Sequence, residues 1–152
     1  MTLTAEKNPV RQSIVFIFGS YLNSYLEKQF QFEMETSLTR QHEEKMELLG
    51  NFYILKNRIE VNRFLGKHKE LFGVLFETYM QIKNIFGENI VELSLKLEND
   101  PEEDYEGLFV TINTNLSPEE ALDLLERFDD EWFLDRVSGE ISSIFTVTVR
   151  AL

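Results

Sequence analysis

A complete helix start signal followed by a regular apolar stripe occupies residues 115–135, and it constrains the fold more than any other stretch. Ser117 can cap the free amides of the first turn, Pro118 is preset for the first helical position, and Glu120 completes a capping box. Such a stripe must be buried against another element, so we expect an amphipathic helix packed on a sheet. The stripe has spacings of three and four and comprises Ala121, Leu122, Leu125, Phe128 and Trp132.

Three segments near the C-terminus alternate as strands with one buried and one solvated face do. The predicted strands are residues 91–98, 108–114 and 141–150, with apolar residues at every second position of 91–97, 108–112 and 145–149. Residues 99–106 separate the first two segments, contain a proline and several acids, and therefore predict a solvated hairpin loop.

Two helices are expected before these strands. They span residues 57–65 and about 70–86, and each is followed by a glycine that can close the last turn. The predicted order is therefore α-α-β-β-α-β, and the fold class is α+β, with helices packed on a small antiparallel sheet. We assign residues 57–152 to this domain and residues 1–56 to an N-terminal extension.

The N-terminal extension gives conflicting signals. Residues 13–18 fit either a short buried strand or a helix start, residues 21–30 keep helical spacing, and residues 30–34 alternate as a strand would. Residues 38–49 predict a partly exposed helix. Four aromatic residues have no evident place in the C-terminal core and motivate the hypothesis of a homodimer. They are Tyr21, Tyr25, Phe30 and Phe32.

Negative charge is concentrated in the C-terminal half. Residues 1–85 contain 11 Lys and Arg against 10 Asp and Glu, whereas residues 86–152 contain 4 against 17. A field of this sign repels phosphate backbones and attracts basic partners. We therefore expect a basic protein partner and no nucleic acid.

The cellular compartment is inferred from cysteine usage and hydropathy. The chain has no cysteine, which excludes disulfides and thiolate sites and suits a reducing cytoplasm. The apolar run at residues 14–18 is far shorter than the ~18 residues that a membrane span needs. We expect a cytoplasmic protein without a membrane partner.

Candidate partner-binding residues lie on the acidic helix. Arg127 can pair with several of the acids there, which favours a solvated or partner-binding face over a metal site, and we predict no cofactor. Trp132 and Phe133 are adjacent, so both cannot point into one helical stripe, and one of them is expected at a rim. There Phe133 would either cover the end of the third strand or serve as an aromatic anchor ringed by acids. The predicted set is Asp123, Glu126, Asp130, Glu131, Trp132 and Phe133.

A resemblance covers the C-terminal part. Residues 60–150, with the segments VELSLKLENDPEED and NLSPEEALDLLERFDDEWFLD, resemble a family of small uncharacterised bacterial proteins. The resemblance implies that this part is one structural unit, and it implies no activity, because the family has none assigned. The resulting hypothesis is a non-enzymatic interaction module for a basic partner, in one form the neutralising member of a two-protein module.

An enzyme is the alternative hypothesis. Gly19 and Ser20, followed by Glu33 and Glu35, are similar to the glycine-serine and paired-acid pattern of small magnesium-dependent nucleotidyltransferases. If Glu33 and Glu35 lay on a strand, they would face the same side and could hold magnesium against a triphosphate. The chain departs from that pattern because the first acid is glutamate rather than aspartate and no basic residue directly follows Ser20.

Overall fold

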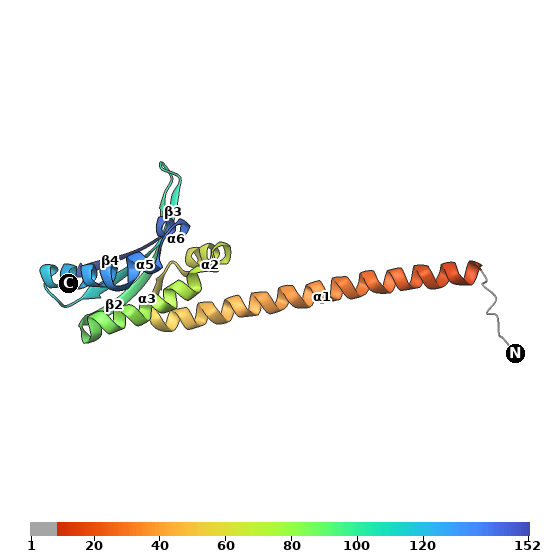
Figure 1. Ribbon diagram of the computed structural model, residues 1–152, viewed down its shortest axis with the longest axis horizontal. Coiled ribbons are helices and arrows are strands. Elements are labelled where there is room, and N and C mark those ends of the chain that lie inside the picture. The colour runs from red at the N-terminus through yellow and green to blue at the C-terminus, as the bar shows by residue number, and fades with distance from the viewer. Residues whose placement is uncertain (1–8) are drawn as a thin grey trace. The chain divides into compact units, whose positions relative to one another are not determined.

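The structure, a computed structural model, describes the backbone of residues 9–152 and the side chains of residues 19–152 (Figure 1). The chain divides after His42, and the second of its two compact units is Glu43–Leu152. The main helices are α1 (Pro9–Phe52), α2 (Arg58–Lys67), α3 (Leu71–Phe86) and α4 (Pro118–Phe128). The short ones are the 3-10 turn η1 (Gly87–Asn89), the π turn η2 (Asp129–Phe133), α5 (Leu134–Arg136) and α6 (Glu140–Ile144). The strands are β1 (Ile54–Lys56), β2 (Ile90–Asp100), β3 (Tyr105–Thr114) and β4 (Phe145–Ala151).

The four strands form one mixed sheet in the order β1-β2-β3-β4. The α+β class is confirmed, but the sequence missed the short strand β1, and the predicted last strand is wrong over residues 141–144, which lie in the helix α6. The prediction of an antiparallel sheet is wrong outside the β2–β3 hairpin, because β1 is parallel to β2 and β4 is parallel to β3. In both cases helices carry the chain back to the starting end of the sheet before the next strand begins, which makes the strands parallel.

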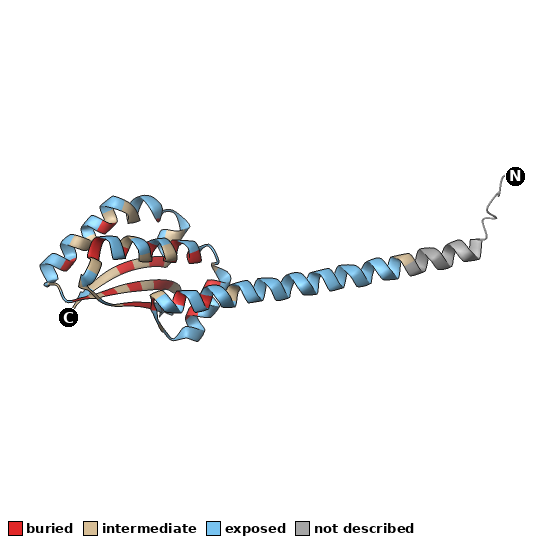
Figure 2. Ribbon diagram, turned by 90° about the horizontal axis from the view of Figure 1, so that it is seen from below, coloured by how far each residue is buried: buried red, intermediate tan, exposed pale blue. Residues whose placement is uncertain are grey.

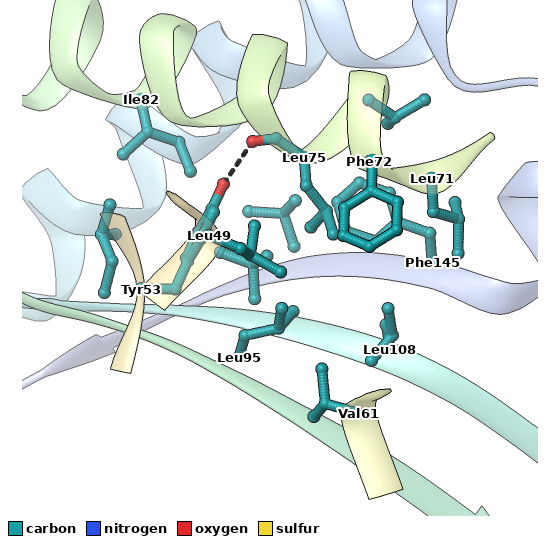
Figure 3. Close-up of a cluster of buried hydrophobic side chains, with 14 of the residues drawn as sticks. Leu49, Tyr53, Val61, Leu71, Phe72, Leu75, Ile82, Leu95, Leu108 and Phe145 are labelled. Carbon is teal, nitrogen blue, oxygen red and sulfur yellow. Dashed lines mark hydrogen bonds between the residues drawn. The ribbon is translucent and has the colours of Figure 1, made fainter. Parts of the chain in front are cut away.

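One face of the sheet carries the core. Leu95 is opposite Val110, which is opposite Val147, and all three side chains are buried. Helices α2, α3 and α4 contribute side chains to the same buried cluster, so they cover this one face (Figure 2). Inside the cluster, the buried Tyr53 hydroxyl donates a hydrogen bond to the Leu75 carbonyl oxygen at 2.7 Å (Figure 3).

The N-terminal extension is helical where the sequence allowed strands. Residues 13–18 and 30–34 both lie within α1, so the strand interpretation of each is wrong; the side chains of residues 13–18 are outside the described set. Alternation over five residues is too short to fix a strand when residues on both sides favour a helix. Residues 20–41 of α1 are all exposed (Figure 2).

The last turns of α1 belong to the compact unit. Met46 and Leu49 are buried in its core, and so is Tyr53, which follows the helix. Residues 43–56, which we assigned to the extension, therefore pack within the same unit as the sheet and the later helices. None of the helices in residues 9–152 is long and apolar enough to span a lipid bilayer.

The β2–β3 hairpin is longer than predicted. Its pairing continues to Asp100 opposite Tyr105, so the predicted eight-residue loop shrinks to a turn at residues 101–104 (Figure 1). The Asp100 carboxylate accepts a hydrogen bond from the Glu102 amide at 3.0 Å and stabilises this turn. Acidic residues are compatible with the ends of these strands because their side chains remain in water.

Candidate functional site

The acidic helix begins as its sequence predicts. The Ser117 hydroxyl accepts a hydrogen bond from the Glu120 amide at 3.2 Å, and Pro118 occupies the first turn. Ala121 and Phe128 are buried, so α4 is anchored to the core by its predicted stripe. Leu122 is the exception, because its side chain is 60% exposed. It follows Ala121 directly and therefore lies about 100° away around the helix.

The helix continues as the π turn η2, which holds both aromatic candidates. The Trp132 and Phe133 rings lie 5.6 Å and 5.5 Å from the Phe128 ring, and Phe133 also lies 5.8 Å from Phe145. A π turn has more residues per turn than an α-helix, so adjacent side chains diverge less. Both rings are half-buried against the core, and Phe133 packs on Phe145 of β4, as in the first of the two alternatives for this residue.

Four exposed side chains form a row along α4, η2 and α5, at spacings of four. We call Leu122, Glu126, Asp130 and Leu134 the acid-and-leucine row. Leu134 is 62% exposed, similar to Leu122 at the other end. In a regular α-helix each step of four residues drifts by about 40°, and the wider π turn reverses part of that drift. Two acids therefore lie between two exposed leucines on one surface.

A second exposed row contains an internal ion pair. It contains Asp123, Arg127, Glu131 and Asp135. Arg127 donates from Nε to the Glu131 carboxylate at 2.7 Å, as the sequence spacing suggested. Neither Glu126 nor Asp130 has an ion pair with any residue that the structure describes. Asp123 and Asp135 at the two ends of the second row have no ion pair with a described residue either, so the acid-and-leucine row differs from it by having no cation and by ending in two exposed leucines.

Asp129 lies beside this row and differs electrostatically from its neighbours. Partial burial raises the pKa of the Asp129 carboxyl above its ordinary value, and the adjacent charge of Asp130 raises that pKa further. A cation placed against η2 would relieve the second effect.

The sheet face opposite the helices forms a shallow concavity of about 680 Å³. Most of its charges are paired: Lys56 lies 3.5 Å from Glu92, and Lys96 lies 3.2 Å from Glu98. Hydroxyl and paired charged side chains are what a solvated sheet face requires, and the lining has no histidine or cysteine to act as a base or nucleophile. Its polar lining comprises Lys56, Glu92, Ser94, Lys96, Glu98, Thr111, Asn113, Thr148 and Arg150.

The geometry required by the enzyme hypothesis is not found in the described part of the chain. Gly19 and Ser20 lie inside α1 and form no phosphate-binding turn. Glu33 and Glu35 are two residues apart on the same helix, so their side chains diverge by about 200° and cannot share a metal ion. Across the described residues, no group of three or more His, Asp or Glu side chains is placed to hold a metal.

Sequence reasoning found the acids and missed the two leucines. The predicted acids Asp123, Glu126, Asp130 and Glu131 are all exposed, but they divide between two rows. The spacing of four from Leu122 to Leu134 was visible in the sequence and is the signal that would have found the row. Comparison with known protein families, curated proteins and solved structures found no match, so the resemblance to a bacterial family stays a prediction.

Proposed function

We propose that the protein is a non-enzymatic interaction module whose acid-and-leucine row binds a basic protein partner. The observation that carries this proposal is the placement of two unpaired acids between two exposed leucines on one helical surface. Exposed apolar side chains supply most of the binding energy at protein interfaces, and unpaired charges steer a partner of opposite sign. The row offers both to one ligand.

The partner that complements this row is a helix or loop with basic side chains between two apolar ones. From Leu122 to Leu134 the row is about 18 Å long, at 1.5 Å per residue. The net charge of −12 would attract a strongly basic protein and offset its charge on binding. Neutralising the basic member of a two-protein module is the form of this function that the charge favours, and we place the module in the cytoplasm because it has no cysteine.

Charge reversal in the two exposed rows tests the proposal. Asp130→Lys alters the acid-and-leucine row, and Asp135→Lys makes the same charge change in the second row, which lacks the two leucines, as a matched control. We expect a basic protein recovered with the wild type in low salt to be lost with Asp130→Lys and with raised salt, and to be kept with Asp135→Lys. Equal recovery with both variants, or no basic protein with the wild type, contradicts the proposal.

We also propose that the protein is a homodimer through α1. Large apolar side chains are unusually dense on its exposed segment, and most helical stability in proteins comes from packing an apolar face. Multi-angle light scattering at micromolar concentration measures the mass, and a monomer would exclude this part of the proposal. The exposed apolar residues are Tyr21, Leu22, Tyr25, Leu26, Phe30, Phe32, Met34 and Leu38.

A further inference from the structure

The exposed apolar residues of α1 do not lie on one face. Tyr25 is four residues from Tyr21 and seven from Phe32, which are close to one and two full turns, so these three rings share a side of the helix. Phe30 is two residues from Phe32 and lies about 200° away from it. We call the side that carries Tyr21, Tyr25, Lys28 and Phe32 the aromatic face.

The two sides differ in charge as well. On the aromatic face, Lys28 lies between Tyr25 and Phe32, and the first acid on this side is Glu35, three residues beyond Phe32. Around Phe30, the residues three before and three after it are Glu27 and Glu33, which are its neighbours on the helix surface. Burying Phe30 would therefore desolvate two carboxylates, whereas burying the aromatic face would desolvate the carboxylate of Glu35 at one end and one cation that aromatic rings can accommodate.

We infer that the aromatic face binds a second copy of itself, with the two α1 helices antiparallel. This inference rests on the proposed homodimer and specifies its contact. Antiparallel pairing centred between Leu26 and Glu27 places Tyr21 against Phe32 of the second copy and Lys28 against its Tyr25. The aromatic pair and the cation–π pair each form twice across the two-fold axis. Parallel pairing would place Lys28 against Lys28, and like charges repel.

The area of the aromatic face suits a second copy. Tyr21, Tyr25 and Phe32 are 71%, 55% and 65% exposed. At about 200 Å² per ring, the three expose roughly 400 Å² in each copy. The adjoining Leu22 and the aliphatic stem of Lys28 bring the total for two copies to about 1,000 Å², the size at which specific interfaces begin.

Two phenylalanines provide a matched test of the face, because Phe30 and Phe32 are each 65% exposed on the same helix. In sedimentation equilibrium of the full chain, we expect Phe32→Glu to raise the dimer dissociation constant roughly 30-fold or more, as loss of an interface hot spot does. Phe30→Glu is expected to leave it within about threefold. An equal or larger effect of Phe30→Glu would overturn the assignment of the face, and circular dichroism checks that both variants stay folded.

The cysteine-free chain allows the orientation to be tested by disulfide cross-linking. Mixed Tyr21→Cys and Phe32→Cys proteins should form a disulfide under mild oxidation, while neither forms one alone. In antiparallel helices, two copies of either position lie about 16 Å apart, beyond disulfide reach. The control mixture, Asn23→Cys with Phe30→Cys, has the same register on the opposite face and should not cross-link.

The outcomes of these experiments distinguish a failure of the antiparallel aromatic contact from a failure of the proposed homodimer. A monomeric wild-type protein would overturn the homodimer and the inference together. A dimer in which Tyr21→Cys cross-links to itself would overturn the antiparallel arrangement alone. A dimer that cross-links only through the control pair would overturn the aromatic face and leave the homodimer intact.

Discussion

Residues 20–41 of α1 and the compact unit Glu43–Leu152 use large apolar residues in opposite ways. In the compact unit, strand and helix residues meet in one buried cluster, with Leu95 and Leu75 fully buried. In residues 20–41 of α1 every residue is exposed, and rings such as Phe30 and Phe32 lie on opposite sides of the helix. The same side-chain types therefore stabilise the fold in one region and remain available for association in the other.

The difference comes from periodicity. In β2, β3 and β4 the apolar residues repeat every second position, so each strand has one apolar face and the sheet can be covered once. In α1 the apolar positions follow no single repeat over residues 21–38, so one partner cannot cover them all.

Truncation of a core residue should show the largest effect. Leu95→Ala removes a fully buried side chain in the central strand β2 and should lower the free energy of unfolding by about 2–5 kcal/mol. Phe30→Ala, on the exposed segment, should change it by no more than about 0.5 kcal/mol. Urea denaturation monitored by circular dichroism measures both, and similar losses for the two variants would remove the contrast.

Loss of the buried Tyr53 hydroxyl should lower the free energy of unfolding by less than Leu95→Ala does. Tyr53→Phe leaves the Leu75 carbonyl without its 2.7 Å donor and should lower the free energy of unfolding by about 1–3 kcal/mol. Burial also raises the pKa of Tyr53 far above its ordinary value, with a smaller contribution from Tyr79.

The same hydroxyl predicts a pH dependence. Above pH ~10 the unfolded chain loses the Tyr53 proton while the folded protein keeps it, so the stability present below that pH should fall by about 1.4 kcal/mol per pH unit. Urea denaturation between pH 9 and 11 gives the slope of the unfolding free energy against pH. In Tyr53→Phe this slope should correspond to one proton fewer than in the wild type. An unchanged slope would mean that the hydroxyl titrates as if it were exposed.

The helix cap of α4 should have an effect of about 1 kcal/mol. Ser117→Ala removes the acceptor of the Glu120 amide and should destabilise the compact unit by that amount. Ser117→Asn keeps a capping oxygen and should restore most of the loss. Thermal unfolding compares the three proteins, and a neutral alanine variant would show that tertiary packing alone holds this helix start.

The smallest effect concerns the carboxyls of η2. Asp130→Asn should lower the pKa of Asp129 only partway toward its ordinary value, because partial burial is the larger cause of the shift. A raised pKa contributes stability while the group is protonated, and this contribution is lost as the pH rises through the folded value. Asp129→Asn should therefore slightly stabilise the protein at neutral pH. Carboxyl carbon NMR titration follows the pKa, and a full return to the ordinary value in Asp130→Asn would assign the shift to charge.

Helices and strands were predicted well where their local sequence signals were complete. The capping by Ser117 and the alternation of the last three strands gave the helix α4 and the strands β2, β3 and β4 in order, and the acids of the site were placed on an exposed surface. The exposed leucines were harder to predict, because Leu122 next to a buried Ala121 looked like part of the same stripe. Tertiary packing determines how far the buried face extends around the helix, and therefore which of two adjacent residues it includes.

The sequence alone specifies which segments are amphipathic, where helices start and where the negative charge lies, because these features depend on residues a few positions apart. The tertiary structure decided the parallel pairing of β1 and β4, the π turn that lets Trp132 and Phe133 both contact Phe128, and the alignment of Leu122 with Leu134. These features depend on how helices cross back over the sheet and how tightly their side chains fill the core. Such packing is a property of segments far apart in the chain, and local periodicity does not record it.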